Sequence, residues 1–143
     1  MPSDTTPAQR FVLDACALIA YLNDETGANV VERLLEGARE NRVQLLVASV
    51  NIYEVFYDCL KRDEVRALQL VNDVYGLPIT VIETLDRPLM YAAGWFKVAY
   101  RVSLADSIAL ALAQQSSAHL VSSDHHELDP IEHDGKMRFQ WIR

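Results

Sequence analysis

Four acidic side chains stand at positions where their carboxylates could act together. Asp14 and Asp124 each follow a short apolar run, while Glu54 and Asp106 lie near the starts of two predicted helices. In a parallel α/β sheet, strand ends and helix starts face the same edge, so the four carboxylates are expected in one crevice. Without a cation they would repel one another, whereas Mg²⁺ or Mn²⁺ accepts oxygen ligands of this kind. The set predicts a site for one or two divalent ions.

Each acid also has a structural alternative. Asp14 and Asp124 could cap the helix or turn that follows, and Glu54 stands three residues after Asn51, which is the spacing of a capping box. Asp106 is the strongest candidate, because its helix is apolar nearly all round and offers no basic residue one turn away. A buried carboxylate is costly unless it is paired or bound to a cation. The lack of a Cys or paired-His ligand set argues against structural zinc.

Short apolar runs alternate with helical periods along the whole chain. Strands are expected at residues 11–13, 45–48, 79–82, 120–121 and 139–142. Helices are expected at residues 15–22, 25–40, 49–61, 63–76, 87–101 and 103–115, with Ser49 or Asn51 as the N-cap of the third. This order predicts a single domain over residues 1–143 with a flexible lead-in at 1–10. The expected fold class is α/β, a three-layer α/β/α arrangement with a central parallel sheet of about five short strands.

The composition is that of an ordinary globular protein, with half of the 143 residues hydrophobic. No apolar run reaches the ~20 residues that a membrane span needs, so no membrane association is expected. Cys16 and Cys59 lie in apolar stretches and are interpreted as buried free thiols of a cytoplasmic protein. The net charge of −7 weighs against a nucleic-acid partner. A cation held by carboxylates would reverse the local field and weaken that objection.

Four segments resemble, in order, the motifs of the PIN-domain family. They are FVLDACALIAYL, SVNIYEVFYD, SLADSIALALA and HLVSSD. No single segment is specific, but the ordered set is, and the resemblance covers residues 11–143. The length and spacing are similar to those of VapC-type toxins from toxin–antitoxin modules.

This resemblance implies a Mg²⁺- or Mn²⁺-dependent endoribonuclease that hydrolyses RNA phosphodiester bonds with metal-activated water. It implies that the four acids hold the metal, with Ser122 and Ser103 as hydrogen-bonding neighbours. It also implies a cognate antitoxin protein as partner, and a homodimer. The candidates for holding RNA phosphates are Lys61, Arg62, Lys97 and Arg101.

The sequence departs from the family pattern in two places. Ala15 and Cys16 follow Asp14 where the family has Thr or Ser and then a small polar residue, and Glu127 stands where the family has an aromatic residue. The missing hydroxyl and the negative charge motivate an alternative function, a catalytically weak or inactive PIN-like module that binds RNA or a protein partner. A phosphohydrolase with an aspartyl nucleophile fits poorly, because Cys16 occupies the place of its second Asp and no Gly-rich phosphate loop is present.

Three further groups leave alternatives open. The segment SSDHHELDPIEHDG is expected to be a solvated loop between the last two strands, with a second metal site as the alternative. Asp58 is either a fringe acid of the site or, as we expect, a partner for Arg62 one turn later. An aromatic set before the SLAD motif belongs either to the core or to a dimer seam or antitoxin groove. Its members are Tyr91, Trp95, Phe96 and Tyr100.

Overall fold

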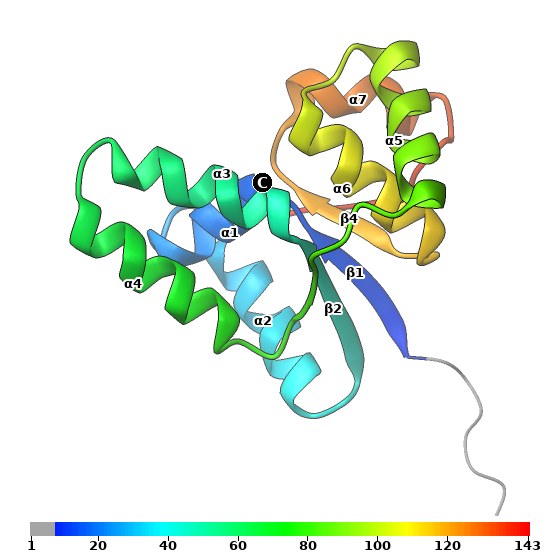
Figure 1. The fold of residues 1–143 in the computed structure, drawn as a ribbon. Coiled ribbons are helices and arrows are strands. Elements are labelled where there is room, and N and C mark those ends of the chain that lie inside the picture. The colour runs from blue at the N-terminus through cyan, green and yellow to red at the C-terminus, as the bar shows by residue number, and fades with distance from the viewer. Residues whose placement is uncertain (1–7) are drawn as a thin grey trace, which may run out of the picture.

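The computed structural model describes residues 8–143, which form five parallel strands and seven helices (Figure 1). In chain order these are β1 (Gln9–Leu13), α1 (Ala15–Leu22), α2 (Ala28–Arg39), β2 (Val43–Ala48), α3 (Ser49–Leu60), α4 (Glu64–Tyr75), β3 (Thr80–Ile82), α5 (Arg87–Tyr100), α6 (Leu104–Gln115), β4 (His119–Ser122), α7 (His125–His133) and β5 (Phe139–Trp141). The strands lie in the order β3-β2-β1-β4-β5. The central strand β1 pairs with β2 and β4, so Asp14 and Asp124 emerge beside each other at the carboxyl edge.

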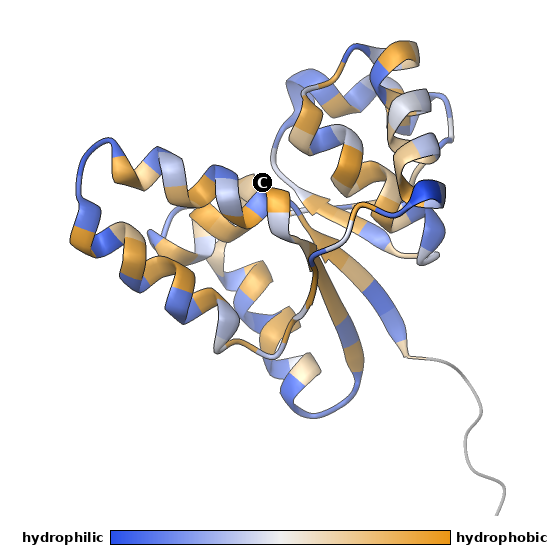
Figure 2. Cartoon of the chain, in the orientation of Figure 1, coloured by the Kyte–Doolittle hydropathy of each residue, from blue (hydrophilic) through white to orange (hydrophobic). Residues whose placement is uncertain are grey.

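Helices cover both faces of this sheet, because its strands are apolar on both sides. Phe11 and Leu13 pack against the α1–α4 side, whereas Val12 between them packs against the α5–α7 side. Figure 1 shows these two helical layers, and Figure 2 shows hydrophobic and hydrophilic residues alternating along the covering helices. The predicted three-layer α/β/α fold is therefore confirmed. Within residues 8–143, no helix combines the length and the apolar character needed to cross a membrane.

Two predicted boundaries at the amino-terminal side are wrong. The strand expected at 11–13 begins at Gln9, so Gln9 and Arg10 belong to β1; the rest of the expected lead-in, apart from Ala8, lies outside the described residues. The helix expected at 25–40 begins only at Ala28, because Gly27 has a φ of 99° that breaks the helical path. A Cβ at Gly27 would lie 2.7 Å from the carbonyl oxygen of Ile142, so this turn also needs glycine for close approach to the residue that follows β5.

The prediction of a loop before the last strand is wrong as well. Residues 125–133 form α7, whose N-cap Asp124 accepts a hydrogen bond from the Glu127 N–H at 3.3 Å. Leu128 and Ile131, three residues apart on one side of α7, are completely buried. That contact with the α5–α6 layer stabilises a helix whose sequence is otherwise polar and contains a proline.

Candidate metal centre

Asp14 divides its two carboxylate oxygens between two environments. Oδ1 accepts a hydrogen bond from the Ala17 N–H at 2.9 Å and so caps α1. Oδ2 has no hydrogen-bond partner among the described residues, and it is shielded from solvent because Asp14 is only 1% exposed. An orphaned buried carboxylate oxygen is costly. It therefore points to a ligand that the protein alone does not supply.

Burial, with a smaller contribution from the charges of Asp124 and Glu54, raises the pKa of Asp14 from 3.8 to about 7. The Ser122 hydroxyl and the Ala17 N–H oppose that shift, yet Ser122 makes no well-formed hydrogen bond to Oδ2. A divalent cation would reverse the balance, because it favours the ionised carboxylate.

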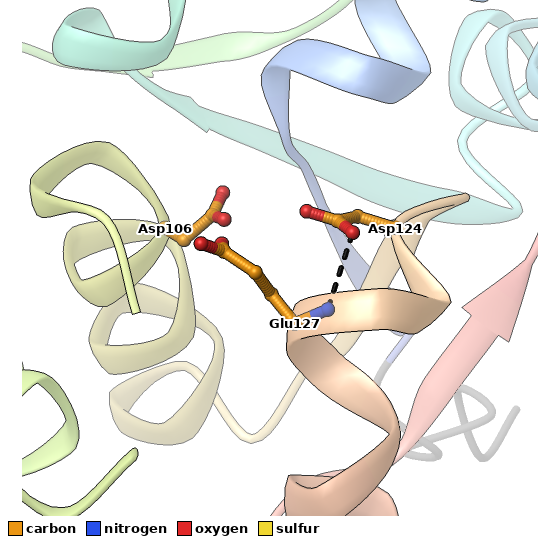
Figure 3. A group of neighbouring side chains, drawn as sticks. All are labelled: Asp106, Asp124 and Glu127. Atoms are coloured by element: carbon orange, nitrogen blue, oxygen red, sulfur yellow. Dashed lines mark hydrogen bonds between the residues drawn. The ribbon is translucent and has the colours of Figure 1, made fainter. Parts of the chain in front are cut away.

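Three carboxylates converge in a close group that does not itself include Asp14 or Glu54. Oxygens of Asp106, Asp124 and Glu127 all lie within 4.8 Å of one another. Figure 3 shows Asp106 on α6 directed toward Asp124 and Glu127 at the start of α7. Sequence reasoning missed Glu127, although its position three residues after the N-cap Asp124 is a helix-start signal that would have placed it.

Burial and neighbouring acids raise the pKa values of Asp106 and Glu54. Burial raises the pKa of Asp106 to about 9, aided by a hydrogen bond shared with Glu127 and by the charges of Asp14, Glu127 and Asp124. Burial also raises the pKa of Glu54, followed by the charges of Glu127, Asp58 and Asp124. Glu54 thus lies within electrostatic reach of the group. We name the five residues the acid cluster: Asp14, Glu54, Asp106, Asp124 and Glu127.

The capping-box alternative for Glu54 is wrong. The N-cap of α3 is Ala48, and Asn51 is a fully buried residue inside the helix. Its side-chain amide reaches the Ala105 carbonyl at 3.5 Å, so it links α3 to the start of α6. Glu54 is left without a capping partner, and Asn51 instead bridges the helices that carry Glu54 and Asp106.

Ser103 and Ser122 hold the backbone beside two of the acids. Ser103 caps α6, and its Oγ accepts a hydrogen bond from the Asp106 N–H at 3.1 Å. The buried Ser122 Oγ accepts from the Asp124 N–H, also at 3.1 Å. Both serines lie where the sequence reasoning put hydrogen-bonding neighbours. Their role toward a metal stays a prediction.

The donor set fits a hard divalent cation. Within residues 8–143, no lysine, arginine or histidine forms an ion pair with a member of the acid cluster. The five carboxylates of the acid cluster, which include the orphaned Oδ2 of Asp14, therefore lack a counter-charge among the described side chains. Oxygen-rich sites of this kind suit Mg²⁺ or Mn²⁺.

The thiol of Cys16 borders the cluster without reacting as a nucleophile. Burial raises its pKa to about 12, and the charges of Asp14, Asp106, Asp124 and Glu54 add to the shift. Such a thiol stays protonated and inert at neutral pH. Cys16 and Cys59 are both free, as the sequence indicated, although Cys16 is only partly buried.

The cations proposed for RNA differ in their availability. Arg62 pairs with Asp58 at 3.2 Å, which confirms the expected partner of Asp58. Lys97 donates to the Val102 carbonyl at 2.9 Å and closes the end of α5. The Lys61 ammonium lies 5.6 Å from the centroid of the Tyr57 ring, and Arg101 is exposed at the helix end. Their contact with RNA stays a prediction.

The histidines of α7 and the aromatic set of α5 lie in different surroundings. His125 is held by Asp129 at 2.7 Å and by the Arg143 carbonyl at 2.8 Å, and the histidines of residues 8–143 join no group of potential metal ligands. The aromatic set of α5 is divided between core and surface. Phe96 is fully buried, whereas Trp95 is 50% and Tyr91 66% exposed.

The parallel fold and its acid cluster define an α/β domain with an acidic edge of the kind that divalent cations occupy. The sequence matches the family model described as PIN domain over residues 11–130. The chain belongs to the PIN-domain family. No curated protein matches it in sequence.

Solved structures share the fold at low sequence identity. One is DNA-bound VapBC from Salmonella typhimurium, with a TM-score of 0.72 and 16% identity, covering 94% of this chain and 99% of the other. Another is VapBC2 from Rickettsia felis bound to a promoter DNA fragment, with a TM-score of 0.71 and 13% identity, covering 93% of this chain and 98% of the other. VapBC-1 from nontypeable Haemophilus influenzae is similar as well, with a TM-score of 0.67 and 13% identity, covering 94% of this chain and 98% of the other. At these identities the likeness concerns the fold.

Proposed function

We propose that this protein is a Mg²⁺- or Mn²⁺-dependent endoribonuclease and the toxin of a toxin–antitoxin module. The observation that carries the proposal is the convergence of Asp106, Asp124 and Glu127, together with the orphaned Oδ2 of Asp14, whose charge acts on Asp106. Membership of the PIN-domain family and the similarity to VapBC structures support it. A cytoplasmic location agrees with the two free cysteines.

In this proposal Asp14, Asp106, Asp124 and Glu127 hold the cation, and Glu54 lies at its edge. When bound, the cation supplies a Lewis acid for a phosphate oxygen and lowers the pKa of water. The protein positions three of these carboxylates by hydrogen bonds at the starts of helices. Asp14 is held by its cap to α1, and Asp106 and Asp124 are held through their N–H groups by Ser103 and Ser122.

The burial of Asp14 restricts water on the sheet side of the cluster, whereas Asp124 and Glu127 are only partly buried. A phosphodiester therefore has access from the α7 side. The Arg62 side chain forms an ion pair and that of Lys97 donates a hydrogen bond to a carbonyl, whereas the side chains of the exposed Lys61 and Arg101 do neither within the described chain. We therefore assign Lys61 and Arg101 to RNA phosphates ahead of Arg62 and Lys97.

A cognate antitoxin and a homodimer complete the proposal. The similar structures are described as VapBC complexes, which supports an antitoxin partner. Apolar side chains also remain exposed on α3 and α4, where a cavity of about 540 Å³ is lined in part by Tyr53, Phe56, Leu68 and Tyr75. Exposed apolar surfaces of this kind mark sites of protein contact.

The decisive test is Asp106→Asn in a cleavage assay on RNA with Mg²⁺ or Mn²⁺. Cleavage should be abolished while the circular dichroism spectrum stays native, because Asn removes one ligand charge and little volume. The matched control is Asp73→Asn on α4, a helix that carries no member of the acid cluster and where the Asp73 carboxylate pairs with Arg66 at 3.6 Å. Cleavage by Asp106→Asn at the wild-type rate would refute the assignment.

An inactive PIN-like module is the second candidate, favoured by Ala15 at the position where the family carries a hydroxyl. It predicts Mg²⁺ binding by calorimetry with no cleavage of several unrelated RNAs. The two candidates therefore differ in turnover and agree in metal binding.

A further inference from the structure

A second concentration of charge lies at the amino edge of the sheet, opposite the acid cluster. A cavity of about 460 Å³ opens where β1 and β4 begin, and Arg10, His119 and Arg138 line it together with the hydroxyl side chains of Ser116 and Ser117. Its lining, taken from residues 8–143, includes no carboxylate. This is unusual for a chain with 20 acidic residues and a net charge of −7.

Neither Arg10 nor Arg138 forms an ion pair within residues 8–143. Arg10 donates from Nε to the Gln44 side-chain oxygen and from Nη1 to the Ser116 carbonyl, both at 3.1 Å. A guanidinium has five N–H donors, so these two bonds orient the group and leave further donors for a ligand. Arg138 forms neither an ion pair nor a side-chain hydrogen bond within the described chain. Together with burial, its charge lowers the pKa of the neighbouring His119.

A neighbouring cavity extends this cationic surface. It measures about 350 Å³, shares Ser117 and Arg138 with the first, and adds Lys136 from the loop before β5. The Lys136 ammonium lies 5.9 Å from the centroid of the Trp95 ring. No acidic residue of the described chain lines this cavity either. We name the joined cavities the amino-edge groove, with Arg10, Arg138 and Lys136 as its cations.

We propose that the amino-edge groove binds the phosphodiester backbone of single-stranded nucleic acid, and specifically the flank of the RNA cut at the opposite edge. The choice of RNA rests on the proposed function. The phosphate chemistry rests on the groove itself, because a guanidinium with free donors pairs with phosphate in a planar fork. Three cations without facing carboxylates suit a polyanion better than a protein surface of mixed charge.

The position of the groove sets a length requirement. Arg10 lies near the start of β1 and Asp14 directly follows its end, and the five residues of the strand span roughly 16 Å. A dinucleotide is too short to contact both edges, since stacked nucleotides advance only about 3.4 Å each. The groove should therefore affect long substrates and leave a dinucleotide unaffected.

The test measures binding of a labelled single-stranded RNA by fluorescence anisotropy, in EDTA so that nothing is cleaved. Arg10→Gln/Arg138→Gln should weaken binding about tenfold at about 0.15 M salt and reduce the slope of log K against log salt by about 1.4, or 0.7 for each cation removed. The matched control, Arg33→Gln/Arg39→Gln on α2, removes the same charge from exposed positions and should stay within about twofold of wild type. Single-stranded DNA of the same sequence should lose affinity in parallel, because backbone contacts do not read the sugar.

Equal losses in the groove variant and the control would overturn the proposal, and so would no loss in either. If Arg10→Gln unfolds the protein, Arg138→Gln/Lys136→Gln provides the same test, since neither side chain anchors the fold through a hydrogen bond. Cleavage separates the two proposals. Groove variants should cut a dinucleotide at the wild-type rate in Mg²⁺, whereas a wild-type protein that binds RNA through the groove but cuts nothing would refute only the nuclease.

Discussion

At the scale of single residues, the capping role and the proposed metal-binding role of Asp14 are compatible. Its Oδ1 satisfies the Ala17 N–H, while its buried Oδ2 faces the repulsion of the other acids. Sequence reasoning treated the cap and the metal ligand as alternatives, because spacing alone does not show how two oxygens of one carboxylate are divided. The same holds for Asp124, which caps α7 and joins the acid cluster.

Asp14→Asn should stabilise the metal-free protein and remove its response to Mg²⁺. Asn keeps the capping oxygen and loses the charge, so at about pH 8 the melting temperature should rise by roughly 3 °C or more, which corresponds to about 1 kcal/mol. Differential scanning calorimetry with and without Mg²⁺ measures both effects. Asp63→Asn is the control, since Asp63 caps α4 at an exposed position. A melting temperature of Asp14→Asn below that of wild type would contradict the prediction.

Glu127→Gln should weaken Mg²⁺ binding about tenfold or more, because loss of a ligand costs at least as much as loss of a group that only orients a ligand. The fold should survive, because the Glu127 side chain is only partly buried. Isothermal titration calorimetry measures the affinity. His126→Gln, at the exposed neighbouring position on α7, should bind Mg²⁺ like wild type; an equal loss in both variants would exclude a specific role for Glu127.

At the scale of elements, apolar runs and caps made most of the fold predictable. Helices α4 and α6 begin after Asp63 and Ser103 as expected, and the strands coincide with apolar runs to within a few residues. Helix α7 was not predictable from periodicity, because only Leu128 and Ile131 are buried in a polar segment with three histidines and a proline. Missing α7 also hid Glu127, since a loop gives no reason to direct that side chain toward Asp106.

Ser103→Ala tests how far a helix start positions the site. Loss of the cap should cost about 1 kcal/mol of unfolding free energy in urea and loosen the first turn, which carries Asp106. Mg²⁺ affinity should fall as well. Asp63→Ala removes the cap of α4 at a similar cost in stability, but α4 carries no member of the acid cluster, so its Mg²⁺ affinity should not change. Equal metal affinity in both variants would show that the first turn of α6 holds Asp106 without Ser103.

At the scale of the whole molecule, the acid cluster makes the metal-free fold sensitive to pH. The folded-state pKa values of Asp14 and Asp106 are raised from 3.8 to about 7 and about 9. Between 3.8 and these values the folded protein binds more protons than the unfolded chain, so stability must fall as pH rises. Below 3.8 both states are protonated and the effect disappears. Above the folded values the destabilisation is complete.

Urea unfolding of the metal-free protein should therefore show decreasing stability from about pH 5 to about pH 8, with a slope of up to about 1.4 kcal/mol per pH unit for each group. Saturating Mg²⁺ should remove or reverse this trend, because it binds the ionised carboxylates and releases protons. Asp14→Asn/Asp106→Asn should flatten the dependence without metal. Stability that rises over this range in metal-free wild type would contradict the raised pKa values.

The acids of the cluster are far apart in sequence, and this has a consequence during synthesis. A ribosome-bound chain that has released only β1 to α5 contains Asp14 and Glu54, but neither Asp106 nor Asp124. The central strand β1 also lacks its neighbour β4 at that stage. The complete cluster can form only after α7 has left the ribosome. A nascent chain of the proposed toxin would therefore be harmless to the RNAs that translate it until α7 has emerged.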